Sequence, residues 1–93
     1  MKSAITELGP LAKTFKALAH PARLLLLKRL MENERCVSDV EKCLGLSQPN
    51  VSQHLRILKD AGLIEGRREH TRVCYRIADD RVCRILRIAM EGD

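Results

Sequence analysis

The chain has 93 residues, of which 45% are hydrophobic and 31% are charged, and its net charge is +5. A chain of this length buries only a small core, so we expect residues 1–93 to form one domain that pairs with a second copy. The positive charge favours a polyanionic partner, whereas the presence of only two aromatic residues, Phe15 and Tyr75, argues against single-strand or RNA-loop recognition by base stacking.

The N-terminal third of the chain predicts two helices. Apolar residues recur at spacings of three and four from Ile5 to Ala19, which is the pattern of an amphipathic helix. His20 and Pro21 end this helix, because the residue before a proline is disfavoured in helical conformation, and Pro21 suits the first turn of the next helix. That second helix, residues 22–31, is apolar on almost every side, so we expect it at the centre of the core.

Two shorter helices follow, separated by the turn Gly45-Leu46-Ser47. The third helix has two possible starts: Cys36 as N-cap with Asp39 at the third helical position, or Ser38 as N-cap with Glu41 completing a capping box. We favour the first, because it gives the longer helix. Ser47 is the predicted N-cap of the fourth helix, whose buried stripe consists of Val51, Leu55, Leu58 and Ala61.

Residues 63–68 and 72–77 predict two strands, and residues from Val82 to Met90 predict a last helix. In the second strand Val73, Tyr75 and Ile77 are expected to point inward, and Arg72, Cys74 and Arg76 outward. The connection lacks Asn-Gly, so we expect a longer, mobile loop at its tip. The predicted fold is mainly α with a β-hairpin wing (α+β), a winged helix-turn-helix of four helices, two strands and a fifth helix.

The fourth helix and the hairpin predict a DNA-binding surface. In a helix-turn-helix the second helix enters the major groove, where Gln and Asn can bond adenine, Arg can bond guanine, and Ser can contact phosphate. Arginines at a hairpin tip suit phosphate or minor-groove contact, although a solvated turn is the alternative. Ser52 and Gln53 are the strongest candidates for base contact, while His54 could equally pack against the third helix. The predicted DNA-binding residues are Ser47, Gln48, Asn50, Ser52, Gln53, His54, Arg56, Arg67, Arg68, His70 and Arg72.

Four stretches of the sequence resemble the ArsR/SmtB family of winged-helix repressors. They are LAHPARLLLLKRL, ERCVSDV, LSQPNVSQHLRILKDAGLI and RREHTRVCYRI, which together cover most of the chain from Leu18 to Ile77. The resemblance implies a homodimer, paired through the first and last helices, that represses transcription by binding an inverted repeat in double-stranded operator DNA until an inducer releases it. The residues expected at the dimer interface are Leu8, Leu11, Phe15, Val82, Ile85, Leu86 and Ala89.

The four cysteines are the candidate sensing residues. Because no apolar run is long enough to span a membrane and no signal peptide is recognisable, we expect a cytoplasmic protein with reduced cysteines. The arsenic-type motif of the family resembles ELCVCDL; here Cys36 matches its first thiol, but Ser38 stands in place of the second. The zinc-type site on the last helix is excluded, since no histidine lies there. Cys36 and Cys43 remain as candidate metal ligands, although they lie about 10.5 Å apart along a regular helix and need a third ligand.

Three interpretations of these cysteines stay open. The first is a thiol-based sensor that takes As(III) or a soft metal ion as inducer, the second is a thiol redox or persulfide sensor, and the third is a repressor whose cysteines sense nothing. The fold needs no cofactor in any of them. An enzyme is disfavoured, because the sequence has no Gly-rich phosphate loop, no Ser/His/Asp set and no metal triad. A winged-helix module for protein assembly is the remaining alternative.

Overall fold

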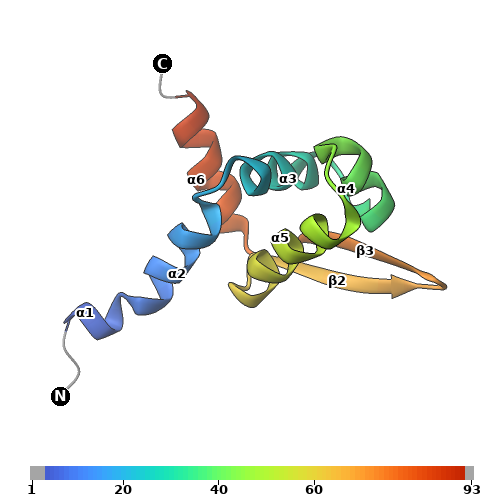
Figure 1. The fold of residues 1–93 in the computed structure, drawn as a ribbon. Coiled ribbons are helices and arrows are strands. Elements are labelled where there is room, and N and C mark those ends of the chain that lie inside the picture. The colour runs from blue at the N-terminus through green and yellow to red at the C-terminus, as the bar shows by residue number, and fades with distance from the viewer. Residues whose placement is uncertain (1–3, 92–93) are drawn as a thin grey trace.

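Six helices and three strands make up residues 4–91, the part of the chain that the computed structural model describes (Figure 1). The strands form one antiparallel sheet in the order β1-β3-β2. In chain order the elements are α1 (Ala4–Glu7), α2 (Gly9–Leu18), α3 (Pro21–Glu32), β1 (Arg35–Cys36), α4 (Val37–Leu44), α5 (Gln48–Asp60), β2 (Ile64–Glu69), β3 (Arg72–Ile77) and α6 (Asp80–Glu91).

The predicted winged helix-turn-helix order is confirmed, with two additions. The first predicted helix is divided into α1 and α2. Pro10 lies in the first turn of α2, where its missing N–H would interrupt a continuous helix. The second addition is β1, a strand of two residues that pairs with β3 directly before α4 begins.

Local signals set the ends of the central helices. The Nδ1 atom of His20 accepts a hydrogen bond from the backbone N–H of Ala22 (3.0 Å) at the start of α3. Cys36 is the N-cap of α4, and its backbone N–H donates to Asp39 (3.4 Å), so the favoured start is confirmed. Gly45 ends α4 in the left-handed conformation (φ +65°). Ser47 occupies the N-cap position of α5, but its side chain makes no capping hydrogen bond.

The core lies where α3 and α5 meet the base of the hairpin and α6. Leu27 and Leu58 are fully buried, with exposed fractions of 0%, which confirms the central position of α3. The hairpin β2–β3, hereafter the wing, extends away from the helices, and α1, α2 and α6 lie at the opposite end of the molecule (Figure 1). None of the described helices is both long enough and apolar enough to cross a membrane.

Two predictions about the wing are wrong. The tip is a tight turn and not a long loop, because Glu69 pairs with Arg72 and only two residues connect the strands. His70, in the left-handed region (φ 58°), takes the conformation that such a turn requires. Cys74 was expected on the outer face, yet it is 5% exposed, because the unforeseen strand β1 pairs with β3 at this position.

Candidate DNA-binding interface

The exposed side of α5 carries the polar residues that the sequence singled out. Val51, Leu55 and Leu58 anchor the opposite side in the core, with exposed fractions of at most 3%. The Nε2 atom of Gln48 donates to the hydroxyl oxygen of Ser52 (3.1 Å), which orients both side chains at the first turns of the helix. Ser52 is half-buried, and the other predicted contact residues near and on this helix apart from His54 are exposed: Ser47, Gln48, Asn50, Gln53 and Arg56.

His54 lies away from this polar surface, on the flank that faces α3. Its ring contacts that of His20, with 4.5 Å between the ring centroids. Its Nδ1 atom is buried and has no hydrogen-bond partner among the described residues. Burial lowers the pKa of His54, and the nearby charges of His20 and Arg23 lower it further. The structure therefore gives His54 a packing position between two helices.

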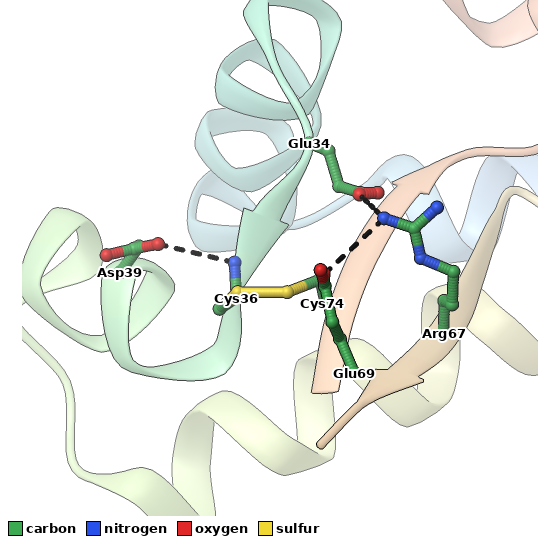
Figure 2. The surroundings of a disulfide bond; sticks show 6 residues. All are labelled: Glu34, Cys36, Asp39, Arg67, Glu69 and Cys74. Carbon is green, nitrogen blue, oxygen red and sulfur yellow. Dashed lines mark hydrogen bonds and ion pairs between the residues drawn. A yellow bond between two sulfur atoms is a disulfide. The ribbon is translucent and has the colours of Figure 1, made fainter. Parts of the chain in front are cut away.

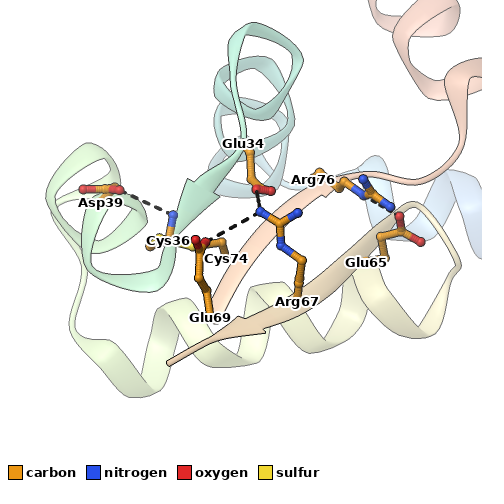
Figure 3. A network of polar contacts seen from close by, with 8 residues as sticks. All are labelled: Glu34, Cys36, Asp39, Glu65, Arg67, Glu69, Cys74 and Arg76. Atoms are coloured by element: carbon orange, nitrogen blue, oxygen red, sulfur yellow. Dashed lines mark hydrogen bonds and ion pairs between the residues drawn. A yellow bond between two sulfur atoms is a disulfide. The ribbon is translucent and has the colours of Figure 1, made fainter. Parts of the chain in front are cut away.

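The predicted wing residues Arg67, Arg68, His70 and Arg72 are all exposed, but they differ in their partners. The Nη2 atom of Arg67 lies 2.8 Å from Oε1 of Glu34 and 3.6 Å from Oε2 of Glu69 (Figure 3). Within residues 4–91 neither Arg68 nor Arg72 forms an ion pair. Arg68 and Arg72 therefore present free guanidinium groups, whereas Arg67 is held across the sheet.

A groove of about 330 Å³ separates the N-terminal end of α5 from the tip of the wing. Gln48 lies on the helix side, Arg72 lies on the wing side, and Cys36 lies between them. Amide and guanidinium groups on two walls suit a phosphate backbone, since both donate hydrogen bonds to phosphate oxygens. The full lining is Cys36, Val37, Ser38, Glu41, Gln48, Thr71, Arg72 and Val73.

The cysteines are arranged differently from the prediction. Cys36 and Cys74 form a disulfide bond (Figure 2), so the expectation of four reduced cysteines is wrong for this pair. Sequence spacing gave no signal for it, because the bond joins residues 38 positions apart. Cys43 is a free, exposed thiol, and Cys83 is free and half-buried.

The predicted metal pair is not brought together. The sulfur of Cys36 is bonded to Cys74 rather than directed towards Cys43. Residues 4–91 contain no group of three or more His, Cys, Asp or Glu side chains that could hold a metal ion. Cys36 and Cys43 therefore do not fit an As(III) or soft-metal site in this arrangement.

A second surface, far from the wing, is apolar. Leu8, Leu11 and Phe15 of the N-terminal segment are between 44% and 57% exposed, as expected for a dimer face. A groove of about 370 Å³ lies between α2 and α6, lined by residues that include Leu11, Ile85 and Ile88. Clustered exposed apolar side chains make this end of the molecule a candidate interaction surface.

Part of the predicted dimer face belongs to the chain's own core. Val82 and Leu86 are 1% and 5% exposed, so their assignment to the interface is wrong, while Ile85 is half-buried and Ala89 is exposed. α6 instead leaves Ile88 and Met90 exposed, and the sequence reasoning placed neither at the interface. Two positions apart on a helix, they lie at the opposite edges of the wide apolar stripe that contains Val82 and Leu86, and only Ile88 lines the groove between α2 and α6. The sequence pattern alone does not divide that stripe between core and partner.

Comparison with known proteins places this architecture among bacterial regulators. A model of the family described as "Bacterial regulatory protein, arsR family" matches residues 20–66. The chain is 41% identical over 86 residues to the biofilm growth-associated repressor of Agrobacterium fabrum, covering 92% of this chain and 71% of that protein. It is 44% identical over 71 residues to the HTH-type transcriptional repressor SmtB of Mycobacterium tuberculosis, covering 76% of this chain but only 53% of that protein.

A solved structure of a winged helix-turn-helix domain has a similar fold. The homodimeric winged helix-turn-helix DNA-binding domain of Mb0332 from Mycobacterium bovis superimposes with a TM-score of 0.88 at 35% sequence identity. The superposition covers 98% of this chain and 86% of that one.

Proposed function

Because the chain belongs to the arsR family of bacterial regulatory proteins, we propose that it acts as a homodimeric repressor that binds double-stranded operator DNA in a sequence-specific manner. It is a transcriptional regulator of the winged-helix type and not an enzyme. We propose a cytoplasmic location, where it has access to chromosomal DNA.

The observation that carries this proposal is the polar side of α5. Gln48, Gln53 and Arg56 are exposed on a helix whose other side is fixed in the core, so the helix can enter a major groove without unfolding. In this proposal Gln53 and Ser52 bond base edges, Asn50 and Arg56 flank them, and Ser47 and Gln48 contact phosphate. We leave His54 out of the interface, because its ring packs against His20.

The wing supplies the second part of the proposed contact. Arg68, His70 and Arg72 are exposed beside the groove that separates the wing from α5, and they would contact phosphates or an adjacent minor groove. Arg67 is a weaker candidate for DNA contact, since its ion pairs with Glu34 and Glu69 would have to break first.

The apolar surface of α1, α2 and α6 fits the proposed dimer contact. Leu8, Leu11, Phe15, Ile85 and Ala89 would meet the same residues of a second copy, together with Ile88. A two-fold axis through this surface would present two α5 helices to one face of the duplex. The expected operator is an inverted repeat whose half-sites are about 34–36 Å apart, centre to centre.

We further propose that a thiol-reactive inducer releases the repressor by acting at Cys36. This residue is the N-cap of α4 and lines the groove beside Gln48, so a group attached to its sulfur lies next to the proposed DNA contact. Arsenite or another soft metal, bound by the reduced Cys36 thiol with ligands other than Cys43, is one candidate inducer, and a persulfide that modifies this thiol is the other. A repressor with unresponsive cysteines, or a winged-helix module for protein assembly, would be a different outcome of the experiments below.

A selection experiment tests the DNA-binding proposal. The chain is used to select duplexes from a random-sequence pool, and the affinity for the selected duplex is measured by fluorescence anisotropy between 50 and 200 mM salt. We expect an inverted repeat and a steep loss of affinity with salt, since phosphate contacts release counterions. Arg56→Ala should weaken binding, and Lys28→Ala, which removes an exposed charge of α3, is the matched control. A pool that remains random after selection would point to the protein-assembly module.

A further inference from the structure

The Cys36–Cys74 bond joins the helix-turn-helix to the wing. Cys36 pairs with Cys74 across β1 and β3, and Cys74 pairs with Arg67 across β3 and β2, so the three residues form one row across the sheet. β1 has two residues and leads directly into α4, for which Cys36 is the N-cap. Among residues 4–91 this is the single covalent link between the helix-turn-helix and the wing other than the main chain.

The side-chain polar contact across this joint is weak. Among the described residues only the Arg67–Glu34 ion pair crosses it, because the Arg67–Glu69 pair lies within β2 and Asp39 accepts from the backbone N–H of Cys36 within the helix-turn-helix segment (Figure 2). The side chains of Arg67 and Glu34 are 57% and 29% exposed, and ion pairs with this much contact with water contribute little. The short pairing of β1 with β3 and the packing of Val37 and Tyr75 against the common core also hold α4 near the wing. The disulfide adds the one covalent constraint on their relative position within residues 4–91.

The same bond lies at the groove between the two proposed DNA-contacting walls. Cys36 lines the groove, and so do Val73, next to Cys74 on β3, and Arg72 at the wing tip. Gln48 at the start of α5 forms the other wall. A link from Cys36 to Cys74 therefore ties the start of α4, which precedes the recognition helix in the helix-turn-helix, to the wing beside this groove.

We propose that the Cys36–Cys74 pair is a reversible redox control of operator affinity, in which the disulfide form binds DNA more tightly than the dithiol form. This inference rests on the proposed DNA-binding function and names the regulation of that same surface. The disulfide holds the two walls of the groove in one arrangement before DNA arrives, so less conformational freedom is lost on binding. An inducer that captures the reduced Cys36 thiol would prevent the bond from forming again, which matches the proposed site of induction.

The chemistry is thiol–disulfide exchange, with a low-molecular-weight thiol as reductant and its disulfide as oxidant. Cys36 is half-buried at the groove, whereas Cys74 is 5% exposed, so an incoming thiolate attacks the sulfur of Cys36. The Cys36–Cys74 bond breaks, Cys74 leaves as a thiolate and takes up a proton, and Cys36 carries the mixed disulfide. A second thiolate attacks the outer sulfur of this mixed disulfide and releases Cys36 as a thiolate that is then protonated. The protein gains two electrons and two protons, and two external thiols become one disulfide; oxidation is the reverse.

The test compares operator affinity in the two redox states of the full chain. The probe is the duplex selected from the random pool, and the protein is equilibrated with reduced or oxidised glutathione, with the state of each cysteine determined by alkylation and mass spectrometry. We expect the oxidised wild type to bind about three- to tenfold more tightly than the reduced form. Cys36→Ser should bind like the reduced form in both buffers, and Cys74→Val, which keeps an apolar side chain at the buried position, should behave in the same way. A Cys43→Ala/Cys83→Ala background, which lacks the two free thiols, should keep the redox response.

The outcomes separate the two proposals. Equal affinities in the two states, a tighter reduced form, or failure of Cys36 and Cys74 to pair in oxidised glutathione would each overturn the redox inference while leaving DNA binding intact. Absence of sequence-dependent binding in both states would instead overturn the proposed function. Circular dichroism of Cys36→Ser and Cys74→Val identifies any variant that fails to fold, and the wild type measured in both buffers remains decisive in that case.

Discussion

The recognition helix α5 and the wing lie side by side, but they are held in place by different means. α5 buries Val51, Leu55 and Leu58 in the common core and leaves its polar residues free. The wing buries Ile64 and Cys74 and packs the half-buried Tyr75 and Ile77 against the same core, and it is in addition tied by a disulfide to Cys36. The recognition helix is therefore held by packing alone, whereas the wing carries an additional covalent constraint that reduction can remove.

The largest expected effect on stability comes from reducing the disulfide that ties the wing to Cys36. Reducing the Cys36–Cys74 bond removes a link between residues 38 positions apart. By the loop-entropy relation, a link of this span stabilises the fold by about 4 kcal/mol. We expect urea unfolding to give a correspondingly lower free energy of unfolding in dithiothreitol than in oxidised glutathione. Cys36→Ser should show no difference between the two buffers; a similar difference in that variant would assign the effect to other thiols.

The packing of α5 is tested by a substitution that creates a cavity beneath this helix. Leu58 is 0% exposed, so Leu58→Ala leaves a void and should lower the free energy of unfolding by about 3 kcal/mol. The neighbouring exposed residue supplies the control, because Lys59→Ala changes the same helix without touching the core. Urea unfolding of both variants measures the difference. A small loss for Leu58→Ala would mean that α5 is held less firmly than its burial indicates.

Features set by neighbouring residues were predictable from the sequence, whereas features that depend on distant partners were not. The buried stripe of α5 and the N-cap of α4 at Cys36 are local patterns, since each depends on residues within one or two turns, and both were predicted. Cys74 was misplaced because its partner strand β1 has only two residues, too few for any periodic signal, and lies 38 residues earlier. The two-residue turn was missed because His70 adopts a left-handed conformation that glycine or asparagine would normally signal. Val82 and Leu86 were misassigned because a wide apolar stripe does not reveal how much of it the chain covers itself.

Substitutions in α5 and in the wing should weaken DNA binding in different ways, because α5 is proposed to contact bases and the wing to contact phosphates. Gln53→Ala should cost about 2 kcal/mol with the selected duplex and much less with a scrambled one, because a base contact is lost. Arg72→Ala should cost about 1 kcal/mol with both duplexes and reduce the salt slope by about one, because a phosphate contact is lost. Anisotropy titrations at three salt concentrations measure both quantities. Equal losses of Gln53→Ala on both duplexes would remove the base-reading role of that residue, and Lys28→Ala again controls for charge.

The smallest expected effect is a pH dependence of the free energy of unfolding that arises from His54 of the recognition helix. Burial, with the charges of His20 and Arg23, lowers the pKa of His54 below its ordinary value of 6.5. As pH falls below about 6.5, the unfolded chain therefore takes up a proton that the folded chain resists, so the free energy of unfolding decreases with acidification and is unaffected by this group at higher pH. Urea unfolding at pH 7.5 and pH 5.5 measures the change. His54→Gln should reduce it, whereas His70→Asn, at the exposed wing tip, should leave it as in the wild type. If His70→Asn reduced it instead, the wing rather than the packed flank of α5 would carry the pH response.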